Sequence, residues 1–190
     1  MRFLLYNIRY CAGIGSKFHL PVPYAGYLKR SADNFDQIAE FIRNIDADIV
    51  GLVEVDSGSF RADNCCQAES IAGRLGYNHV VESKYREGSM AQRVPVLGKQ
   101  GNALLFKDKI TQHRFHFFKQ GVKRLVIEAS TGEVTVFLVH LSLTYRNRQH
   151  QLEQLYKLVR QVQGSVIVAG DFNVLWGDQE LELFLAASGL

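Results

Sequence analysis

The chain has 190 residues, a hydrophobic fraction of 47% and a formal net charge of +3 at pH 7. This length and hydrophobic content are enough for a folded domain with a sizeable core, and they exclude a disordered chain. The charge excess is smaller than that of most dedicated nucleic-acid-binding proteins, although it suits an anionic substrate. Because no apolar run has the length of a signal peptide or a membrane span, we expect a cytoplasmic protein.

In the first half of the chain, short apolar runs alternate with segments of helical periodicity. Asp33 is a candidate N-cap for the first helix, and Gly76 is suited to end the second. Residues 11–30 and 82–101 lack periodicity and are predicted to be long loops, which are usually functional or mobile. In chain order, the pattern predicts a strand at 3–8, a helix at 33–45, a strand at 48–53, a helix at 67–75 and a strand at 77–81.

The second half contains more strands and no linker, repeat or low-complexity tract. Strands outnumber helices, and hairpins occur beside crossovers, so we predict a mixed sheet with helices packed outside it, in one domain spanning residues 1–190. In chain order we expect strands at 102–106 and 113–118, a hairpin of 122–129 with 133–141, a helix at 148–162, a buried strand from 166, and a last helix from Asp178 to residue 185.

The three cysteines, Cys11, Cys65 and Cys66, are an odd number with one adjacent pair. This pattern fits neither a disulfide framework nor the spacing of zinc ligands. We therefore expect reduced thiols, which agrees with a cytoplasmic location.

Four predicted strands end in polar side chains. Taken singly, each has a simpler interpretation: a turn-forming asparagine, a solvated loop acid, a structural histidine or a plain turn. Taken together they indicate function, because neighbouring strand ends would bring them into one cleft. The residues are Asn7, Glu54, His140, and the pair Asp171 and Asn173.

These residue types favour phosphoester hydrolysis. Glutamate and asparagine oxygens without clustered cysteine or histidine suit a hard cation, Mg²⁺ or Mn²⁺, which can polarise a phosphoryl oxygen. Asp171 can orient or deprotonate a water or hold a leaving group, and His140 can donate to a phosphoryl oxygen. Acyl transfer is disfavoured because no Gly-x-Ser-x-Gly elbow occurs, and an ordinary nucleotide-binding domain is disfavoured because no P-loop or Gly-x-Gly-x-x-Gly occurs.

The ordered set resembles the endonuclease/exonuclease/phosphatase superfamily, which has the deoxyribonuclease I-like fold. The resemblance implies an α+β sandwich of two packed mixed sheets flanked by helices, and Mg²⁺-dependent hydrolysis of phosphoesters by in-line attack of water. By position, Glu54 resembles the principal metal ligand and Asn7 assists it. The segments that carry the resemblance are Asn7, Gly-Leu-Val-Glu-Val around Glu54, Gly-Asn-Ala-Leu-Leu from 101, Val-His-Leu-Ser around His140, and Gly-Asp-Phe-Asn from 170. In the same way, His140 resembles the phosphate-contacting group, and Asp171 and Asn173 resemble the pair that orients nucleophile and phosphate.

One family motif is absent. The family pattern ends in Ser-Asp-His on a late strand, whereas this sequence has no Asp-His dipeptide and no histidine after Asp171. The resemblance therefore implies a domain that lacks its C-terminal strands, with weak or no hydrolysis by this chain alone. The missing strands would leave a sheet edge that a partner or a second copy covers. The alternative function is a non-catalytic binding or assembly module.

The sequence does not name the substrate, which in this superfamily ranges from DNA and RNA to inositol phosphates, lipid head groups and protein–nucleic acid adducts. Three further candidates for substrate binding are Asn102, Arg146 and Arg148. Support of a strand edge explains Asn102 equally well, and the start of a helix explains the two arginines. The loop with Lys84, Arg86, Arg93 and Lys99 would follow a nucleic-acid backbone or be a solvated loop.

Overall fold

The computed structural model describes residues 1–13, 32–85, 88–174, 177 and 179–190. It divides into two compact units, Met1–Lys109 and Ile110–Leu190, which we call unit 1 and unit 2. Each unit has its own sheet, and each is described by itself.

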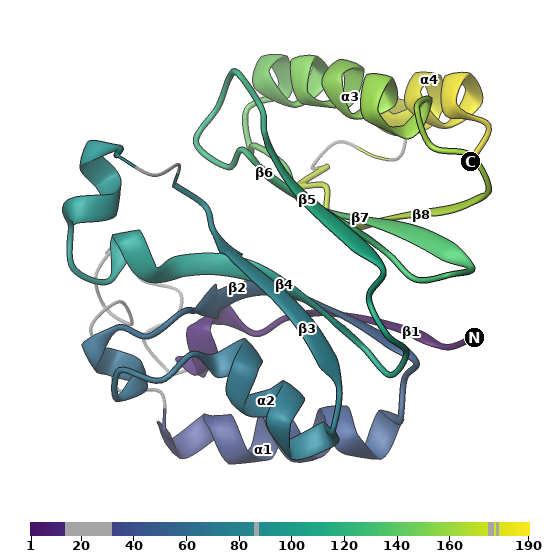
Figure 1. Cartoon of the computed structure of the whole chain (residues 1–190). Helices are drawn as coiled ribbons and strands as arrows, with labels where there is room; N and C mark the ends of the chain where they lie inside the picture. The colour runs from purple at the N-terminus through teal and green to yellow at the C-terminus, as the bar shows by residue number, and fades with distance from the viewer. Residues whose placement is uncertain (14–31, 86–87, 175–176, 178) are drawn as a thin grey trace. The chain divides into compact units, whose positions relative to one another are not determined.

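The sheet of unit 1 is mixed, and two helices cover one of its faces (Figure 1). Its strand order is β1-β2-β4-β3, with β1 parallel to β2 and the other pairs antiparallel. Apolar side chains of both helices pack with alternate residues of β2, including Val50 and Leu52, as expected for a strand with one face towards helices. The elements are β1 (Phe3–Asn7), α1 (Ala32–Ile45), β2 (Ile49–Asp56), α2 (Gln67–Leu75), β3 (Asn78–Ser83) and β4 (Gln100–Phe106).

Unit 2 repeats this plan with a second mixed sheet. Its order is β5-β6-β7-β8, in which only β7 and β8 are parallel, and α3 connects them. Leu152, Leu155 and Val159 of α3 and Phe184 of α4 pack on Phe137 and other residues of the sheet. The elements are β5 (Gln112–Phe117), β6 (Leu125–Ser130), β7 (Val134–His140), α3 (Tyr145–Val159), β8 (Ser165–Asp171) and α4 (Gln179–Ser188).

The predicted α+β class with mixed sheets is confirmed, and most predicted elements are present. Helix α2 has the predicted bounds, and Gly76 caps it in the left-handed conformation with φ 71°. Helix α1 already begins at Ala32, so Asp33 lies inside it and is not its N-cap. The proposed capping residue of the last helix, Asp178, lies outside the described residues, as do residues 14–31 of the first long loop. The prediction of a single domain stays a prediction.

The second long loop is shorter and more ordered than predicted. Strand β3 extends to Ser83, and β4 begins at Gln100. Between them lie two short 3-10 helices, η3 (Met90–Arg93) and η4 (Leu97–Lys99). Two more 3-10 helices, η1 (Arg9–Cys11) and η2 (Phe60–Ala62), follow β1 and β2.

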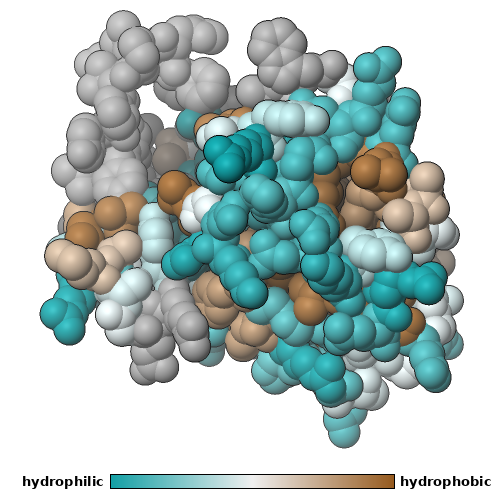
Figure 2. All heavy atoms as spheres, turned by 90° about the horizontal axis from the view of Figure 1, so that it is seen from above, coloured by the Kyte–Doolittle hydropathy of each residue, from teal (hydrophilic) through white to brown (hydrophobic). Residues whose placement is uncertain are grey.

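On the face shown in Figure 2, the described residues are mainly hydrophilic, with smaller groups of hydrophobic residues among them. The more exposed large hydrophobic residues include Leu183 of α4, at 79% exposure, and Val122, at 74%. Among the described residues, no helix combines the length and the apolar character that crossing a membrane requires.

Candidate functional site

Glu54 sits in a β-bulge of unit 1. Val53 pairs with Asn102 of β4 and Val55 pairs with Gly101, so Glu54 is an extra residue that the ladder leaves out. Its φ of 58° lies in the left-handed region, which is unfavourable for residues other than glycine. A bulge re-aims the side chain at its position, and strained backbone of this kind concentrates at functional sites. Glu54 therefore lies inside β2, and its positive φ distinguishes it from Val53 and Val55 on either side.

Asn102 holds this bulge in place. Its side chain is 1% exposed, and its Oδ1 accepts a hydrogen bond of 3.2 Å from the backbone N–H of Glu54. Its Nδ2 is buried and has no hydrogen-bond partner among the described residues. Of the two interpretations of Asn102, support of the strand edge has a direct contact in the structure.

Asn7 ends β1 beside the bulge. It pairs with Val53, the residue before Glu54, and the backbone N–H of Ile8 donates to the Val53 carbonyl over 3.0 Å. The side-chain Oδ1 of Asn7 accepts from the N–H of Arg9 over 3.1 Å, so the short helix η1 orients the amide. Unit 1 thus brings Asn7 and Glu54 to neighbouring strands.

The η1 turn is itself fixed by a buried glutamine. Gln67, 2% exposed, donates through Nε2 to the Tyr10 carbonyl over 2.9 Å and accepts at Oε1 from the N–H of Asp56, also over 2.9 Å. Arg9, Tyr10 and Cys11 all have positive φ, so this turn needs such external bonds. The amide of Gln67 therefore connects the residues after Asn7 to the end of β2.

A buried ion pair completes the support of unit 1. The Asp56 carboxylate accepts from Ser59 N at 2.7 Å, from Ser59 Oγ at 2.6 Å and from Arg61 Nε at 2.5 Å, and both charged side chains are at most 1% exposed. The Arg61 guanidinium lies 4.2 Å from the centre of the Tyr10 ring. A charge pair buried this deeply needs further hydrogen bonds, and the Asp56 carboxylate receives them from Ser59.

Lys84 belongs to the same network and not to a solvated basic loop. It is 6% exposed, and its Nζ donates to the Tyr10 hydroxyl over 2.8 Å. The prediction that Lys84 faces solvent or a nucleic-acid backbone is therefore wrong. Arg86 lies outside the described residues. Arg93 and Lys99 are exposed.

Unit 2 brings its three predicted catalytic residues together. His140 ends β7 and pairs with Asp171, which ends the parallel strand β8. His140 Nε2 lies 3.5 Å from Asp171 Oδ2, and the histidine is 1% exposed while the aspartate is 36% exposed. Asn173 donates through its backbone N–H to Asp171 Oδ1 over 3.0 Å and through Nδ2 to the Leu141 carbonyl over 2.8 Å. An acid, an imidazole and an amide thus share the ends of two adjacent strands.

The glycine of the Gly-Asp-Phe-Asn motif has a steric role. Gly170 has φ +150°, and a Cβ at this position would lie 1.9 Å from the Val139 carbonyl oxygen. Only glycine lets β8 approach β7 this closely. Because Asp171 follows directly, this close approach sets the distance between Asp171 and His140.

A residue that the sequence did not indicate also contacts His140. Lys123 precedes β6, and its Nζ contacts His140 Nε2. No motif marks Lys123, because the contact joins residues 17 positions apart through the fold of unit 2.

The two candidate arginines differ. Arg146 is exposed on α3. Arg148 is 1% exposed, donates to the carbonyls of Ser142 and Leu143 over 2.9 Å each, and donates through Nε to Glu180 Oε2 over 2.7 Å. These contacts give Arg148 a structural role, because they join α4 to the segment after His140.

The donor set of unit 1 fits a hard cation. Among the described residues no group of three or more His, Cys, Asp or Glu side chains could hold a metal, so a multi-ligand zinc-type cluster is absent from this part of the chain. Asn7 and Glu54 offer amide and carboxylate oxygens on neighbouring strands, and no hydrogen bond or ion pair of a described residue engages the Glu54 carboxylate. Mg²⁺ often uses one or two carboxylates and keeps several waters, so these residues fit it.

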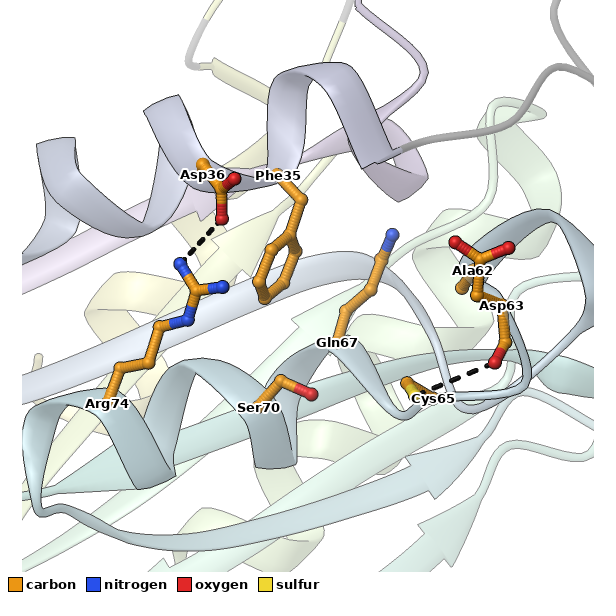
Figure 3. A pocket seen from close by; sticks show the side chains of 8 residues that line it. All are labelled: Phe35, Asp36, Ala62, Asp63, Cys65, Gln67, Ser70 and Arg74. Carbon is orange, nitrogen blue, oxygen red and sulfur yellow. Dashed lines mark hydrogen bonds and ion pairs between the residues drawn. The ribbon is translucent and has the colours of Figure 1, made fainter.

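A separate pocket of about 300 Å³ lies beside α1 and α2 (Figure 3). Arg74 and Asp36 form an ion pair of 2.7 Å at one side, and the Cys65 thiol donates to the Asp63 carbonyl at 3.6 Å on the other. None of the predicted site residues lines it. The thiol of Cys65 and the hydroxyl of Ser70 in its lining both donate to backbone carbonyls, so no described hydrogen bond pairs either of them with a base.

A sequence model of the Endonuclease/Exonuclease/phosphatase family matches residues 4–190. The chain belongs to the endonuclease/exonuclease/phosphatase family. Among curated proteins, no significant match to the chain is found. Family membership extends over both units, and therefore over Asn7 and Glu54 as well as His140 and Asp171.

Several solved structures resemble this chain in fold. TDP2 from C. elegans is 19% identical with a TM-score of 0.59, covering 94% of this chain and 48% of its own. The human Nocturnin catalytic domain with bound sulfate is 19% identical with a TM-score of 0.66, covering 99% of this chain and 70% of its own. ANGEL2, described as a 2',3'-cyclic phosphatase, is 20% identical with a TM-score of 0.64, covering 96% of this chain and 55% of its own.

At these identities the likeness shows the fold, and the predicted deoxyribonuclease I-like fold of this endonuclease/exonuclease/phosphatase family member is confirmed. The chain spans about half the length of the C. elegans TDP2 chain, at 48%.

Proposed function

We propose that this chain is a metal-dependent phosphoester hydrolase in which water attacks a phosphate in line. Its family is generally hydrolytic and acts on phosphoesters, which supports the reaction class. The observation that carries the proposal is the pairing of His140 with Asp171 at adjacent strand ends, with Asn173 bound to both the Asp171 carboxylate and the Leu141 backbone. A buried imidazole beside a half-exposed carboxylate suits proton transfer to and from water and phosphate.

In unit 1, Glu54 would be the principal ligand of Mg²⁺ or Mn²⁺, and Asn7 would assist it. The bulge supports this role, because it removes Glu54 from the regular alternation of β2 and re-aims its side chain. A bound divalent ion supplies Lewis-acid polarisation of a phosphoryl oxygen and stabilises its developing charge. Asn102 acts on Glu54 through the backbone and is a positioning residue.

In unit 2, Asp171 orients the attacking water or accepts its proton, and Asn173 positions the water and the phosphate. His140 stabilises charge on a phosphoryl oxygen by donating a hydrogen bond to it. Arg146 is exposed and is the candidate for attracting an anionic substrate. Arg148 is not a candidate, because its guanidinium is bound by the carbonyls of Ser142 and Leu143.

The substrate is a phosphodiester or phosphomonoester, with nucleic acid among the candidates. The structural relatives include a 2',3'-cyclic phosphatase and a catalytic domain with a bound sulfate, which are compatible with either kind of ester. Because the family's Asp-His motif is absent from this sequence, we propose that hydrolysis by this chain is weak. A cytoplasmic location stays a prediction.

A second candidate function is a binding or assembly module, and the position of β8 favours it. In the described part of the chain β8 pairs only with β7, so β8 forms an edge of the unit 2 sheet. An edge strand presents unpaired backbone groups that can bind another strand. A second copy or a partner protein is the proposed occupant of this edge.

Hydrolysis of bis-p-nitrophenyl phosphate with MgCl₂ or MnCl₂ tests the catalytic proposal. We expect slow release of p-nitrophenol that EDTA abolishes and that Glu54→Gln lowers by about 100-fold, or to background. Glu69→Gln is the matched control, because Glu69 is an exposed glutamate on α2 of the same unit. Equal turnover in the presence and absence of metal would contradict the proposal, and no turnover at all would favour the assembly module.

A further inference from the structure

Lys123 brings a positive charge to the ends of β7 and β8. Its Nζ contacts His140 Nε2, and the same nitrogen of His140 lies 3.5 Å from Asp171 Oδ2. An ammonium group has no acceptor, so in this contact Lys123 donates and the imidazole accepts. An ammonium, an imidazole and a carboxylate therefore lie side by side in unit 2.

A buried glutamine holds the backbone of Lys123 in place. Gln151 of α3 is 0% exposed, and its Nε2 donates to the carbonyl of Lys123 over 2.7 Å and to that of Gln120 over 3.0 Å. Its Oε1 accepts from the N–H of Ser142 over 2.9 Å. One amide thus ties the turn that carries Lys123 to the segment just after His140.

The same turn requires a glycine. Gly121 has φ +90°, and a Cβ there would lie 2.2 Å from Ser142 Oγ and 2.8 Å from Gln151 Nε2. The turn therefore lies against Ser142 and Gln151 with no room for a side chain. Because the backbone on both sides of the contact is fixed, the approach of Lys123 to His140 is part of the fold of unit 2.

We propose that Lys123 is a further substrate-binding residue, which donates from Nζ to a phosphoryl oxygen of the phosphoester, and that Gln151 is its positioning residue. The inference rests on the proposed function for the nature of the substrate. A lysine ammonium has three N–H donors, so it can bind an anionic oxygen beside the imidazole. Its charge offsets that of Asp171, which would otherwise repel a phosphate.

The contact with Lys123 also determines which ring nitrogen of His140 carries a hydrogen. While Nε2 accepts from Lys123, a neutral imidazole carries its proton on Nδ1. When a phosphoryl oxygen takes over the Lys123 donor, Nε2 is released from that contact as a free acceptor, and it donates to the phosphate only after it has taken up a proton from solvent. Lys123 would therefore bind the phosphoryl group first, and the protonated His140 would join it in binding that group.

Calorimetric titration of the full chain with inorganic phosphate, without divalent metal, tests the role of Lys123. Lys123→Met is expected to weaken phosphate binding by about tenfold or more, and Lys123→Arg by less, because the charge is kept. Lys119→Met is the matched control, since Lys119 is an exposed lysine near the same turn, and it should change the affinity by less than about twofold. The ¹⁵N resonances of the His140 ring report the contact directly and should shift in Lys123→Met.

The outcomes separate this inference from the proposed function. Phosphate affinity and His140 resonances that are unchanged in a folded Lys123→Met would overturn the inference, whatever the hydrolysis assay shows. A wild-type chain that binds no phosphate would overturn it as well. Phosphate binding that depends on Lys123 in a chain without any metal-dependent hydrolysis would support the inference and refute the catalytic proposal.

Discussion

At the scale of single residues, Glu54 has a conformation that its side chain disfavours. Its φ of 58° is sustained by the bulge and by the hydrogen bond from its N–H to Asn102 Oδ1. Glycine adopts this conformation without steric cost, whereas other L-residues pay about 1–2 kcal/mol. A glutamate in this position agrees with the metal-binding role proposed for its carboxylate.

We therefore expect the Glu54→Gly variant to be at least as stable as the wild-type chain. The variant should lack metal-dependent hydrolysis. Relief of the backbone strain offsets the usual cost of glycine, which is about 0.5–1 kcal/mol in a strand. Urea unfolding measures the difference. Glu82→Gly is the control, because Glu82 lies in β3 opposite Asn102 and has no positive φ, and it should lower the free energy of unfolding by about 1 kcal/mol. Equal losses in both variants would show that the bulge is not strained.

Cys11 gives a second prediction at this scale. The side chain is 0% exposed, and burial, with a smaller contribution from the charge of Asp56, raises its pKa from 9.0 to about 12. The folded state therefore favours the neutral thiol, while the unfolded chain loses the proton near pH 9. The contribution of this thiol to stability is complete below pH 9 and is lost as the pH rises towards 12, at a limiting slope of about 1.4 kcal/mol per pH unit.

Urea unfolding between pH 8 and pH 10.5 checks whether the Cys11 thiol lowers the stability as the pH rises. The wild-type chain should lose stability with rising pH more steeply than Cys11→Ala, although Cys11→Ala is less stable at pH 8 because of the cavity. Cys65→Ala, which removes an exposed thiol, should keep the wild-type slope. Parallel pH profiles for the wild type and Cys11→Ala would rule out the assignment.

At the scale of elements, the sequence predicted those features that depend on local patterns. Helix α2 has the predicted bounds because Gly76 follows the last apolar residue of its periodic face. The antiparallel pair of β6 and β7 follows from alternating apolar residues on both sides of Thr131 and Gly132. The polar residues at the ends of β1, β7 and β8 were likewise predicted from the places where apolar runs stop.

Features that depend on distant contacts were not predicted. Helix α3 begins at Tyr145, before its apolar periodicity starts, and Arg148 is buried in it by contacts with Glu180. Lys84 lies in a segment with the composition of a loop, yet its ammonium donates to the hydroxyl of Tyr10, 74 residues earlier in the chain. Lys123 reaches His140 because Gln151 of α3 holds its backbone. In each case the partner is distant in sequence, where periodicity carries no information.

At the scale of the whole molecule, the candidate chemistry is divided between the two units. Unit 1 has the oxygen ligands suited to a hard cation, Asn7 and Glu54, and unit 2 has the groups suited to proton transfer and phosphate contact, His140, Asp171 and Asn173. The order of these residues along the chain was enough to predict the family. Their local geometry was not, because the bulge at Glu54 and the close approach at Gly170 are properties of paired strands.

The edge formed by β8 leads to the last prediction, which concerns self-association. Val166 and Val168 pack into the unit 2 core, whereas Ile167 alternates to the other face of the strand and is half-buried. In the described part of the chain β7 is the only neighbour of β8, so the opposite edge can pair with a strand of a second copy. A charged side chain within an edge strand opposes such pairing.

Sedimentation velocity over a range of protein concentrations should therefore show a concentration-dependent dimer for the wild-type chain. Ile167→Lys should shift this equilibrium towards the monomer by about tenfold or more, which corresponds to about 1.4 kcal/mol. Leu183→Lys is the control, because Leu183 is 79% exposed on α4 and lies outside the strand edge. If Leu183→Lys dissociated the dimer and Ile167→Lys did not, association would depend on the apolar surface of α4, and the β8 edge would have no part in it.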